Sequence, residues 1–326
     1  MDEAEAIATV ANSRNLKTSN ARLRAAYMYY VEGLTQNEIA ERLGIGRVTV
    51  VRHLNEARRK REVRFEIETG ISDCIELELR LEKEFGLDKA IVAPDSGDPS
   101  TIRDLIGFST GAYLSEILVD GISIGVSWGR TLSRALVTLA PRTLQDASVV
   151  SLLGGIYQAR AFNPSEFAWQ VAAMIGAECY MLTAPAIVDS PQTKQALMER
   201  CGLDHIVARA AKTDIVVISV GAIGENSTAL QYSQHMLSID LAAEMKKAGA
   251  IGDMFFNFFD RDGKLVDHPV NERIMSVPIQ SIRGVPTRIM ASGGIEKVPA
   301  IRAGMSMMAA NVLITNEGTA RALVGG

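Results

Sequence analysis

Apolar, strand-like runs alternate with helical stretches through most of this 326-residue chain, from about residue 89 to residue 315. The run 215–218 is apolar at every position, which is typical of a strand that is buried on both faces. Such strands separated by helices predict an α/β fold whose large domain is a doubly wound, Rossmann-like, mostly parallel sheet. The predicted strands are 89–94, 121–127, 148–153, 178–182, 215–220, 252–259, 287–291 and 311–315, and helices predicted between them include 102–118, 130–140 and 192–200.

The segment before residue 62 follows a different pattern, that of short amphipathic helices. Residues 20–31 carry apolar side chains at intervals of three and four, which predicts one helix. Thr35 is a favourable N-cap, and Glu38 three positions later completes a capping box. A second helix should therefore cover residues 36–43.

A third helix is predicted over residues 47–61, after a turn in which Gly44 permits a left-handed backbone. Two short helices joined by such a turn cross steeply and need small or apolar residues where they touch. The residues that meet this need are Ile39, Ala40, Leu43, Ile45 and Val50, and further apolar residues at helical spacing are Val48, Val51, Leu54 and Ala57. The pattern predicts a helix-turn-helix of the winged-helix type, with a purely structural helical hairpin as the alternative.

Basic residues are concentrated in the same segment. Residues 1–64 hold twelve lysines and arginines against eight acidic residues, a net charge of +4 in a chain whose total is −4, so the remainder carries −8. A polyphosphate partner responds to the local field, so a basic head on an acidic body is typical of an attached DNA-binding module.

The third helix would lie in the major groove, with its first residues at base edges and its later residues at phosphates. The candidates for contact with bases or the nearby backbone are Arg47, Thr49, Arg52 and His53, and those for phosphate contact are Arg58 and Arg59 with Lys60, Arg61 and Arg64. His53 has core packing as its alternative, and a solvated surface charge is the alternative for each basic residue.

A short strand and a hinge mark the predicted domain boundary. Val63, Phe65 and Ile67 alternate with charged residues, which predicts a strand or wing after the third helix. A hinge-like stretch follows at residues 69–73. The predicted domains are therefore residues 1–69, for DNA binding with the wing and hinge, and residues 70–326, for ligand binding and oligomerisation.

Glycine-rich loops follow several predicted strands, at the edge where doubly wound sheets bind their ligands. In the first loop, backbone amides, hydroxyl groups and an arginine could hold a phosphate at the start of a helix. The candidate effector-binding residues are Gly125, Ser127, Trp128, Gly129, Arg130 and Thr131 in that loop, Gln158 and Asn163 near the second, Lys297 in the third, and Asp253 as an acceptor for hydroxyl groups. Glycine turns in α/β proteins are also often only turns, which is the structural alternative for each loop.

Gly125, Ser127 and Gly129 also match GxSxG, the nucleophile elbow of α/β-hydrolases. A hydrolase would need a histidine downstream, at the end of a strand, with an acid between the serine and the histidine. His268 falls in a predicted surface turn, between Asp267 and Pro269, and His235 falls in a polar helical stretch, so neither position suits that role. An anion-binding loop is the favoured interpretation.

Several classes of protein are disfavoured by composition. No apolar run approaches the roughly 18 residues of a membrane span, and the acidic N-terminus lacks the features of a secretory signal. The three cysteines show no CxxC spacing, so neither a disulfide framework nor a zinc ribbon is indicated. We expect a cytoplasmic protein without membrane contact, metal or cofactor.

The chain resembles the SorC family of bacterial transcriptional regulators over nearly its whole length. This family includes regulators of sorbitol and deoxyribonucleoside use and of central glycolytic genes. The segments that carry the resemblance are 34–44, 48–54, 125–131, 252–253, 293–297, 302–303 and 311–323.

The resemblance implies an effector domain related in fold to sugar-phosphate isomerases and deaminases, with a sugar, polyol or sugar phosphate bound above the sheet. By analogy, loop 125–131 would hold phosphate, and Asp253 and Lys297 would contact the sugar or its phosphate. It also implies a homotetramer, or a dimer of dimers, on an inverted-repeat operator. The loop at Gln158 and Arg160 lacks a lysine, which argues against Schiff-base capture of an effector there.

We therefore expect a DNA-binding regulator of a carbohydrate or polyol catabolic operon, controlled by a sugar or sugar phosphate and not itself an enzyme. One alternative is a sugar-phosphate isomerase or deaminase that carries a DNA-binding appendage and uses Asp253 with Lys297. Another is a constitutive DNA-binding scaffold with an empty pocket.

Overall fold

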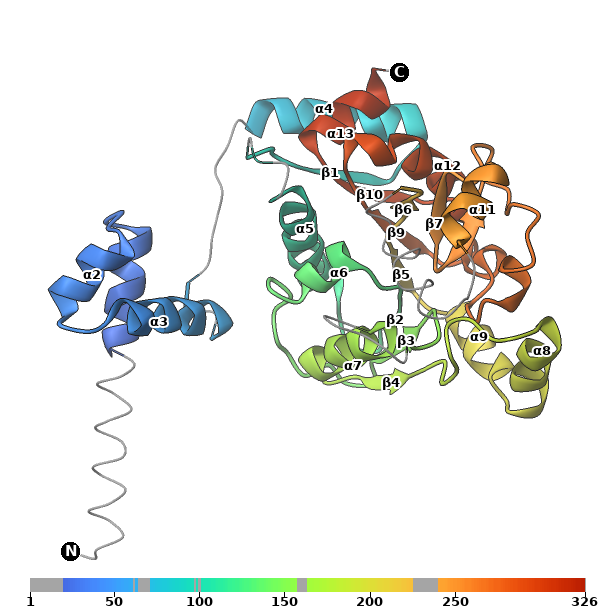
Figure 1. Ribbon diagram of the computed structural model, residues 1–326, viewed down its shortest axis with the longest axis horizontal. Coiled ribbons are helices and arrows are strands. Elements are labelled where there is room, and N and C mark those ends of the chain that lie inside the picture. The colour runs from blue at the N-terminus through green and yellow to red at the C-terminus, as the bar shows by residue number, and fades with distance from the viewer. Residues whose placement is uncertain are drawn as a thin grey trace, which may run out of the picture. The chain divides into compact units, whose positions relative to one another are not determined.

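The computed structural model describes residues 20–60, 62–63, 71–96, 98, 101–156, 163–224 and 240–325. The chain divides into two compact units, Met1–Glu68 and Thr69–Gly326, each with its own core (Figure 1). The strand or wing expected at residues 63–67 lies outside the described residues apart from Val63. In the described part of the chain, no helix is both long enough and apolar enough to cross a bilayer.

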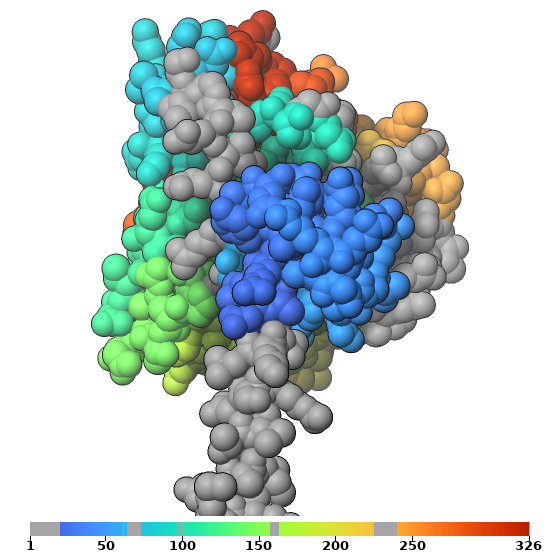
Figure 2. Space-filling view, turned by 90° about the vertical axis from the view of Figure 1, so that its left-hand side faces the viewer, coloured from blue at the N-terminus to red at the C-terminus, as the bar shows by residue number. Residues whose placement is uncertain are grey.

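The first unit contains a helix over residues 20–30, α2 (Gln36–Leu43) and α3 (Arg47–Arg59). The capping box forms at α2: the Thr35 hydroxyl accepts from the Glu38 backbone N–H at 3.3 Å, and the Glu38 carboxylate accepts from the Thr35 N–H at 2.7 Å. Gly44 takes the predicted left-handed conformation, with φ of 64°. The helices enclose a small core of Ala25, Ala26, Ile39, Val50, Leu54 and Ala57, and Figure 2 shows their outer surface in blue.

The second unit is built on a seven-stranded sheet in which every strand pairing is parallel. The strand order is β1-β10-β9-β5-β2-β3-β4, which Figure 1 shows from β1 beside α4 to β4 beside α7. The strands are β1 (Lys89–Ala93), β2 (Ser123–Val126), β3 (Ser148–Ser151), β4 (Glu178–Tyr180), β5 (Ile215–Ile218), β9 (Thr287–Ala291) and β10 (Val312–Asn316). The predicted α/β fold is confirmed.

Helices cover both faces of this sheet, as the apolar run in β5 requires. Val216 and Ile218 belong to a core shared with α4, α12 and α13, whereas Ile215 and Val217 belong to a core shared with α5, α6 and α7. The helices are α4 (Ile71–Phe85), α5 (Ile102–Ile117), α6 (Arg130–Ala135), α7 (Pro164–Ile175), α8 (Pro191–Arg200), α9 (Asp204–Ala210), α11 (Leu241–Lys247), α12 (Val298–Met308) and α13 (Glu317–Val324), with 3-10 turns η2 (Asn271–Arg273), η3 (Ile279–Ile282) and η4 (Ile295–Lys297).

The single strand predicted over residues 252–259 is wrong. The chain instead forms two short antiparallel strands, β7 (Gly252–Met254) and β8 (Asn257–Phe259), and β6 (Gly221–Ala222) pairs with β7 in a small separate sheet. In the turn between β7 and β8, Phe255 and Phe256 take left-handed backbone conformations, with φ of 53° and 63°. The apolar composition of this segment resembles a buried strand because the turn itself is buried.

Two interactions hold this turn in its unusual conformation. The buried Asn257 side-chain amide donates to the Met254 and Phe255 carbonyl oxygens, at 3.0 and 3.1 Å, and to the Ser276 hydroxyl at 2.9 Å. The Phe256 ring stacks on Trp128, with ring centroids 5.2 Å apart. Left-handed conformations at non-glycine residues are strained and persist only where surrounding contacts stabilise them, often near functional sites.

Candidate functional site

A pocket of about 490 Å³ opens at the carboxyl ends of β2, β5 and β9. The chain proceeds from β2 outward to β3 and β4, and then returns through β5 toward β9 and β10 on the opposite side. The order of the strands therefore reverses beside β5 and β2. Doubly wound sheets bind ligands at such a switch point, because the loops diverge there and leave a crevice.

The loop after β2 supplies one wall of the pocket. Ser127, Trp128, Gly129, Arg130 and Thr131 all line it, as the sequence predicted for an effector loop. Gly129 has φ of 144°, a conformation that favours glycine, and it precedes α6 without a capping side chain. The start of α6 and the hydroxyl groups of Ser127 and Thr131 thus come to the same wall of the pocket.

The small three-stranded sheet supplies the opposite wall and carries Asp253. This side chain is 6% exposed, and Gly221 faces it across the β6–β7 pair. A Cβ atom on Gly221 would lie 2.2 Å from Asp253 Oδ1, so only glycine leaves room for the carboxylate. Burial raises the pKa of Asp253 to about 6. The hydrogen bond from the Phe256 backbone N–H and the charge of Lys297 lower this pKa, but burial has the larger effect.

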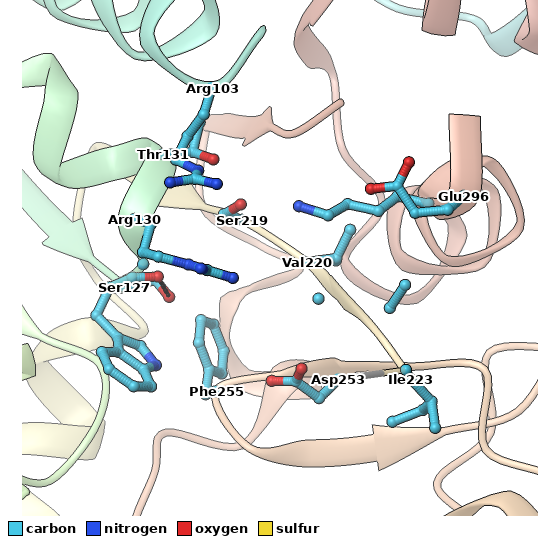
Figure 3. Close-up of a pocket in the computed structure, with 16 residues that line it drawn as sticks. Arg103, Ser127, Arg130, Thr131, Ser219, Val220, Ile223, Asp253, Phe255 and Glu296 are labelled. Carbon is cyan, nitrogen blue, oxygen red and sulfur yellow. Dashed lines mark hydrogen bonds between the residues drawn. The ribbon is translucent and has the colours of Figure 1, made fainter. Parts of the chain in front are cut away.

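Three basic side chains come to the pocket from separate parts of the chain. Arg103 lies in the first turn of α5, Arg130 at the start of α6 and Lys297 at the end of η4. Burial lowers the pKa of Lys297, and the charges of Arg103 and Arg130 lower it further, while Glu296 and Asp253 raise it. Figure 3 shows Arg103, Arg130 and Ser219 together, with Asp253 on the hairpin across the pocket.

Two of the predicted effector residues that the structure describes do not line this pocket. Gly125 lies inside β2, where a Cβ atom would meet Leu152 and Val216 at 3.0 Å, so its small size serves packing of the sheet. Asn163 caps α7, accepting from the Ser165 N–H at 3.2 Å. Gln158 lies outside the described residues.

The glycines at 154 and 155 also have a structural explanation. The Gly154 N–H donates to the Met275 carbonyl and the Gly155 N–H to the Ala184 carbonyl, each at 2.8 Å. A Cβ atom on Gly154 would lie 2.5 Å from the Ala184 oxygen. These glycines allow neighbouring backbone segments to approach, which is the structural alternative given for this loop.

Other pocket residues were not predicted from the sequence. Arg103, Phe255 and Glu296 are three of them. The others come from the segment after β5 and are Ser219, Val220, Gly221, Ala222, Ile223 and Gly224. The glycines at 221 and 224 directly follow a buried apolar strand, so the rule applied to the other glycine loops would have found this one. Arg103 had no comparable signal, because it reaches the pocket only through the placement of α5.

The GxSxG interpretation gains no support from the geometry. Ser127 is 2% exposed, and its hydroxyl group makes a long contact of 3.5 Å with the Trp128 carbonyl oxygen. The pocket lining within the described residues includes no histidine. His268 instead lies 2.8 Å from the Glu244 carboxylate on α11. Among the described residues, no group of three His, Cys, Asp or Glu side chains is placed to hold a metal ion.

In the first unit, α3 presents a basic outer face. Arg47, Arg52, Arg58 and Arg59 are exposed and Thr49 is partly buried. His53 is 5% exposed and belongs to the inner face, where burial lowers its pKa. The structure thus places His53 in the core, the alternative given for it from sequence.

Several arginines of this unit have partners within it, including Arg59, which lies 3.6 Å from the Glu56 carboxylate. Arg22 is buried and pairs with Glu62, with its Nε 2.6 Å from Oε2, which ties the helix at 20–30 to the segment after α3. The Arg58 Nε donates to the Tyr30 hydroxyl at 2.7 Å. Because Arg47, Arg52 and Arg59 are exposed whereas Arg22 is buried, these three are better placed for nucleic acid than Arg22.

Comparison with known families matches both units. Residues 69–325 match a family described as "Putative sugar-binding domain", and residues 26–60 match "Sigma-70, region 4". The first match covers most of the chain and contains every residue that lines the pocket.

Individual relatives align along nearly the whole chain. The erythritol catabolism regulatory protein EryD of Brucella abortus is 30% identical over 93% of this chain and 96% of its own length. The deoxyribonucleoside regulator of Bacillus subtilis is also 30% identical, with the same shares covered. The full-length sorbitol operon regulator SorC from Klebsiella pneumoniae has a similar structure, with a TM-score of 0.70 at 24% identity over 94% of this chain and 99% of that one.

Proposed function

We propose that this chain, which belongs to the SorC family of sugar-binding transcriptional regulators, controls a carbohydrate or polyol operon in response to a sugar phosphate or related polyol phosphate. The observation that carries the proposal is the convergence of Arg103, Arg130 and Lys297 on one pocket that also holds the buried Asp253. The pocket thus offers cations for a phosphate and an acceptor for hydroxyl groups.

The cationic side of the pocket suits a dianionic group. Arg103 and Arg130 both lower the pKa of Lys297, which means that their positive charges oppose the charge on its ammonium group. A bound phosphate would relieve this repulsion and accept hydrogen bonds from both guanidinium groups. The Thr131 hydroxyl, which also lines the pocket, adds a further donor.

Asp253 suits the other end of such a ligand. A carboxylate accepts hydrogen bonds from two neighbouring hydroxyl groups, and its low exposure makes each of these bonds effective. The names of the relatives refer to erythritol catabolism, to deoxyribonucleosides and to a sorbitol operon. Erythritol, deoxyribonucleosides and sorbitol all carry several hydroxyl groups. A sugar or polyol carrying one phosphate satisfies both ends of the pocket.

The first unit would bind double-stranded operator DNA through α3. We propose an inverted-repeat operator bound by a homotetramer or a dimer of dimers, because two-fold related heads recognise two-fold related half-sites. The effector must bind more tightly to one arrangement of the heads than to another, since only differential affinity shifts an equilibrium.

A thermal-shift panel tests the pocket. We expect phosphorylated sugars or polyols to raise the melting temperature, and their unphosphorylated counterparts to raise it less, because a ligand that binds only the folded state stabilises it. Arg130→Ala should weaken binding of the phosphorylated ligand roughly ten- to a hundred-fold and largely remove the preference for phosphate.

Arg134→Ala is the matched control for this experiment. Arg134 lies on the same helix and pairs with Asp104 at 2.9 Å, and it does not line the pocket. Its substitution should leave ligand binding unchanged. If no sugar, polyol or phosphorylated derivative stabilises the protein, the proposed effector function fails and a scaffold role is favoured.

An enzymatic role is the second candidate because Asp253 and Lys297 have oppositely shifted pKa values in one pocket. Such pairs are common where protons are transferred. A turnover assay with pentose and hexose phosphates distinguishes the two roles. Product that forms with the native protein and is lost with Asp253→Ala would contradict a purely sensory function.

A further inference from the structure

Val48 is an apolar side chain that the fold leaves in solvent. It is 83% exposed, the largest exposed fraction among the exposed large apolar side chains of the described residues. Its spacing with Leu54 and Ala57 had suggested a shared apolar face of α3. The structure instead buries Val50, His53, Leu54 and Ala57, which leaves Val48 on the outer face.

The core of the unit gains nothing from this valine. Valine is also a weaker helix former than alanine, so local helix stability does not account for it either. Val48 is the second residue of α3, and Arg52, one turn further on, is exposed on the same face of the helix. Because the exposed Arg47 and Arg52 flank Val48, this face does not suit an apolar protein surface. It suits a polyanion that also presents an apolar group.

The first turn of α3 is also open to a polyanion. Gly46 precedes the helix without a capping side chain, and the first turn contains no acidic residue. A Cβ atom on Gly46 would meet no described residue within 4 Å, so the described part of the chain leaves space around this end of the helix. A helix start of this kind suits phosphate, and a helix that enters the major groove at this end would carry the adjacent Val48 with it.

We infer that Val48 contacts the C5-methyl group of a thymine in each half-site and so determines sequence specificity at that position. In the major groove, thymine is the base that presents a methyl group, and an apolar side chain is the residue type that recognises it. Arg52 would contact the neighbouring base edge or phosphate. This inference rests on the proposed DNA-binding function and goes further by naming the base that α3 recognises.

Replacement of thymine by deoxyuridine tests the inference, because it removes only the methyl group. The full-length chain is first used to select its operator from randomised duplexes, and each thymine of the selected site is then replaced in turn. We expect one symmetry-related pair of thymines at which deoxyuridine weakens binding by the native chain roughly three- to ten-fold per half-site. Val48→Ala should weaken binding to the thymine operator by a similar factor and should bind both operators equally.

Val31→Ala is the matched control. Val31 belongs to the same unit, is 65% exposed and follows the helix at 20–30, outside α3. It should retain the native preference for thymine. The inference is overturned if Val48→Ala keeps the native response to deoxyuridine at every position, or if it weakens binding to all duplexes alike. Failure of the native chain to select any duplex would overturn the proposed function as well, which separates the two outcomes.

Discussion

Asp253 combines a polar role with an apolar environment, and this determines how it titrates. Its carboxyl group is buried between the hairpin and Gly221, and burial raises its pKa from 3.8 to about 6. The folded state therefore binds this proton more tightly than the unfolded state. The stability that the group contributes is fully present below about pH 4 and is lost as the pH rises through about 6.

Asp253→Asn should remove this pH dependence. At pH 8 the variant should be more stable than the native chain, by up to about 3 kcal/mol, because no buried charge forms. The difference should vanish near pH 4, and sugar-phosphate binding at pH 8 should fall at least about ten-fold because the charged acceptor is lost. Urea denaturation at the two pH values measures the stability, with the exposed Asp262→Asn as a control. Equal stability of the variant and the native chain at pH 8 would contradict the shifted pKa.

The β6–β7–β8 sheet positions the Asp253 carboxylate as a unit. Gly221 in β6 gives the carboxylate its space, and Asn257 in β8 fixes the turn through bonds to the Met254 and Phe255 carbonyl oxygens. The stack of Phe256 on Trp128 joins this turn to the residues after β2. The two walls of the pocket are thus in direct contact through this stack.

Gly221→Ala tests this arrangement at the level of the element. Its Cβ atom would overlap Asp253 Oδ1, so the carboxylate must move and the affinity for the sugar phosphate should fall about ten-fold or more. Gly224→Ala is the control, because among the described residues a Cβ atom there meets nothing within 4 Å although the residue lines the same pocket. Isothermal calorimetry measures both affinities. Similar losses in the two variants would show that the loop as a whole, and not the space for the carboxylate, matters.

At the scale of the whole molecule, two units with separate cores carry separate chemistries. The residues on the exposed face of α3 belong to Met1–Glu68, and those that line the pocket belong to Thr69–Gly326. A regulator needs these two activities to be coupled, and coupling between two binding sites is reciprocal. Operator DNA should therefore change the affinity for the sugar phosphate by the same factor as the sugar phosphate changes the affinity for DNA.

Substitutions in the two units should accordingly be separable. Arg52→Ala should weaken specific operator binding by about 1 to 3 kcal/mol and leave the stabilisation by sugar phosphate unchanged. Arg130→Ala should bind the operator normally and lose the response to the ligand. Fluorescence anisotropy at fixed salt, with DNA from upstream of the gene, measures both effects. Undiminished operator affinity of Arg52→Ala would place the DNA contacts elsewhere.

The local elements of this protein were predictable from neighbouring residues. The capping box at Thr35 and Glu38, the left-handed turn at Gly44 and the buried run in β5 depend on interactions within a few positions along the chain. The loop after β2 was also predicted, because a glycine-rich segment between a strand and a helix is itself a local signal.

Tertiary structure alone decided which residues meet. The order of the strands brings Arg103, Asp253 and Lys297 to one pocket, although long stretches of chain separate them. Packing against the other helices of the first unit turned His53 inward and left Val48 in solvent, against the apolar periodicity of α3. Periodicity specifies that a helix forms, but the choice of its buried face depends on contacts with segments distant in sequence, which no local pattern contains.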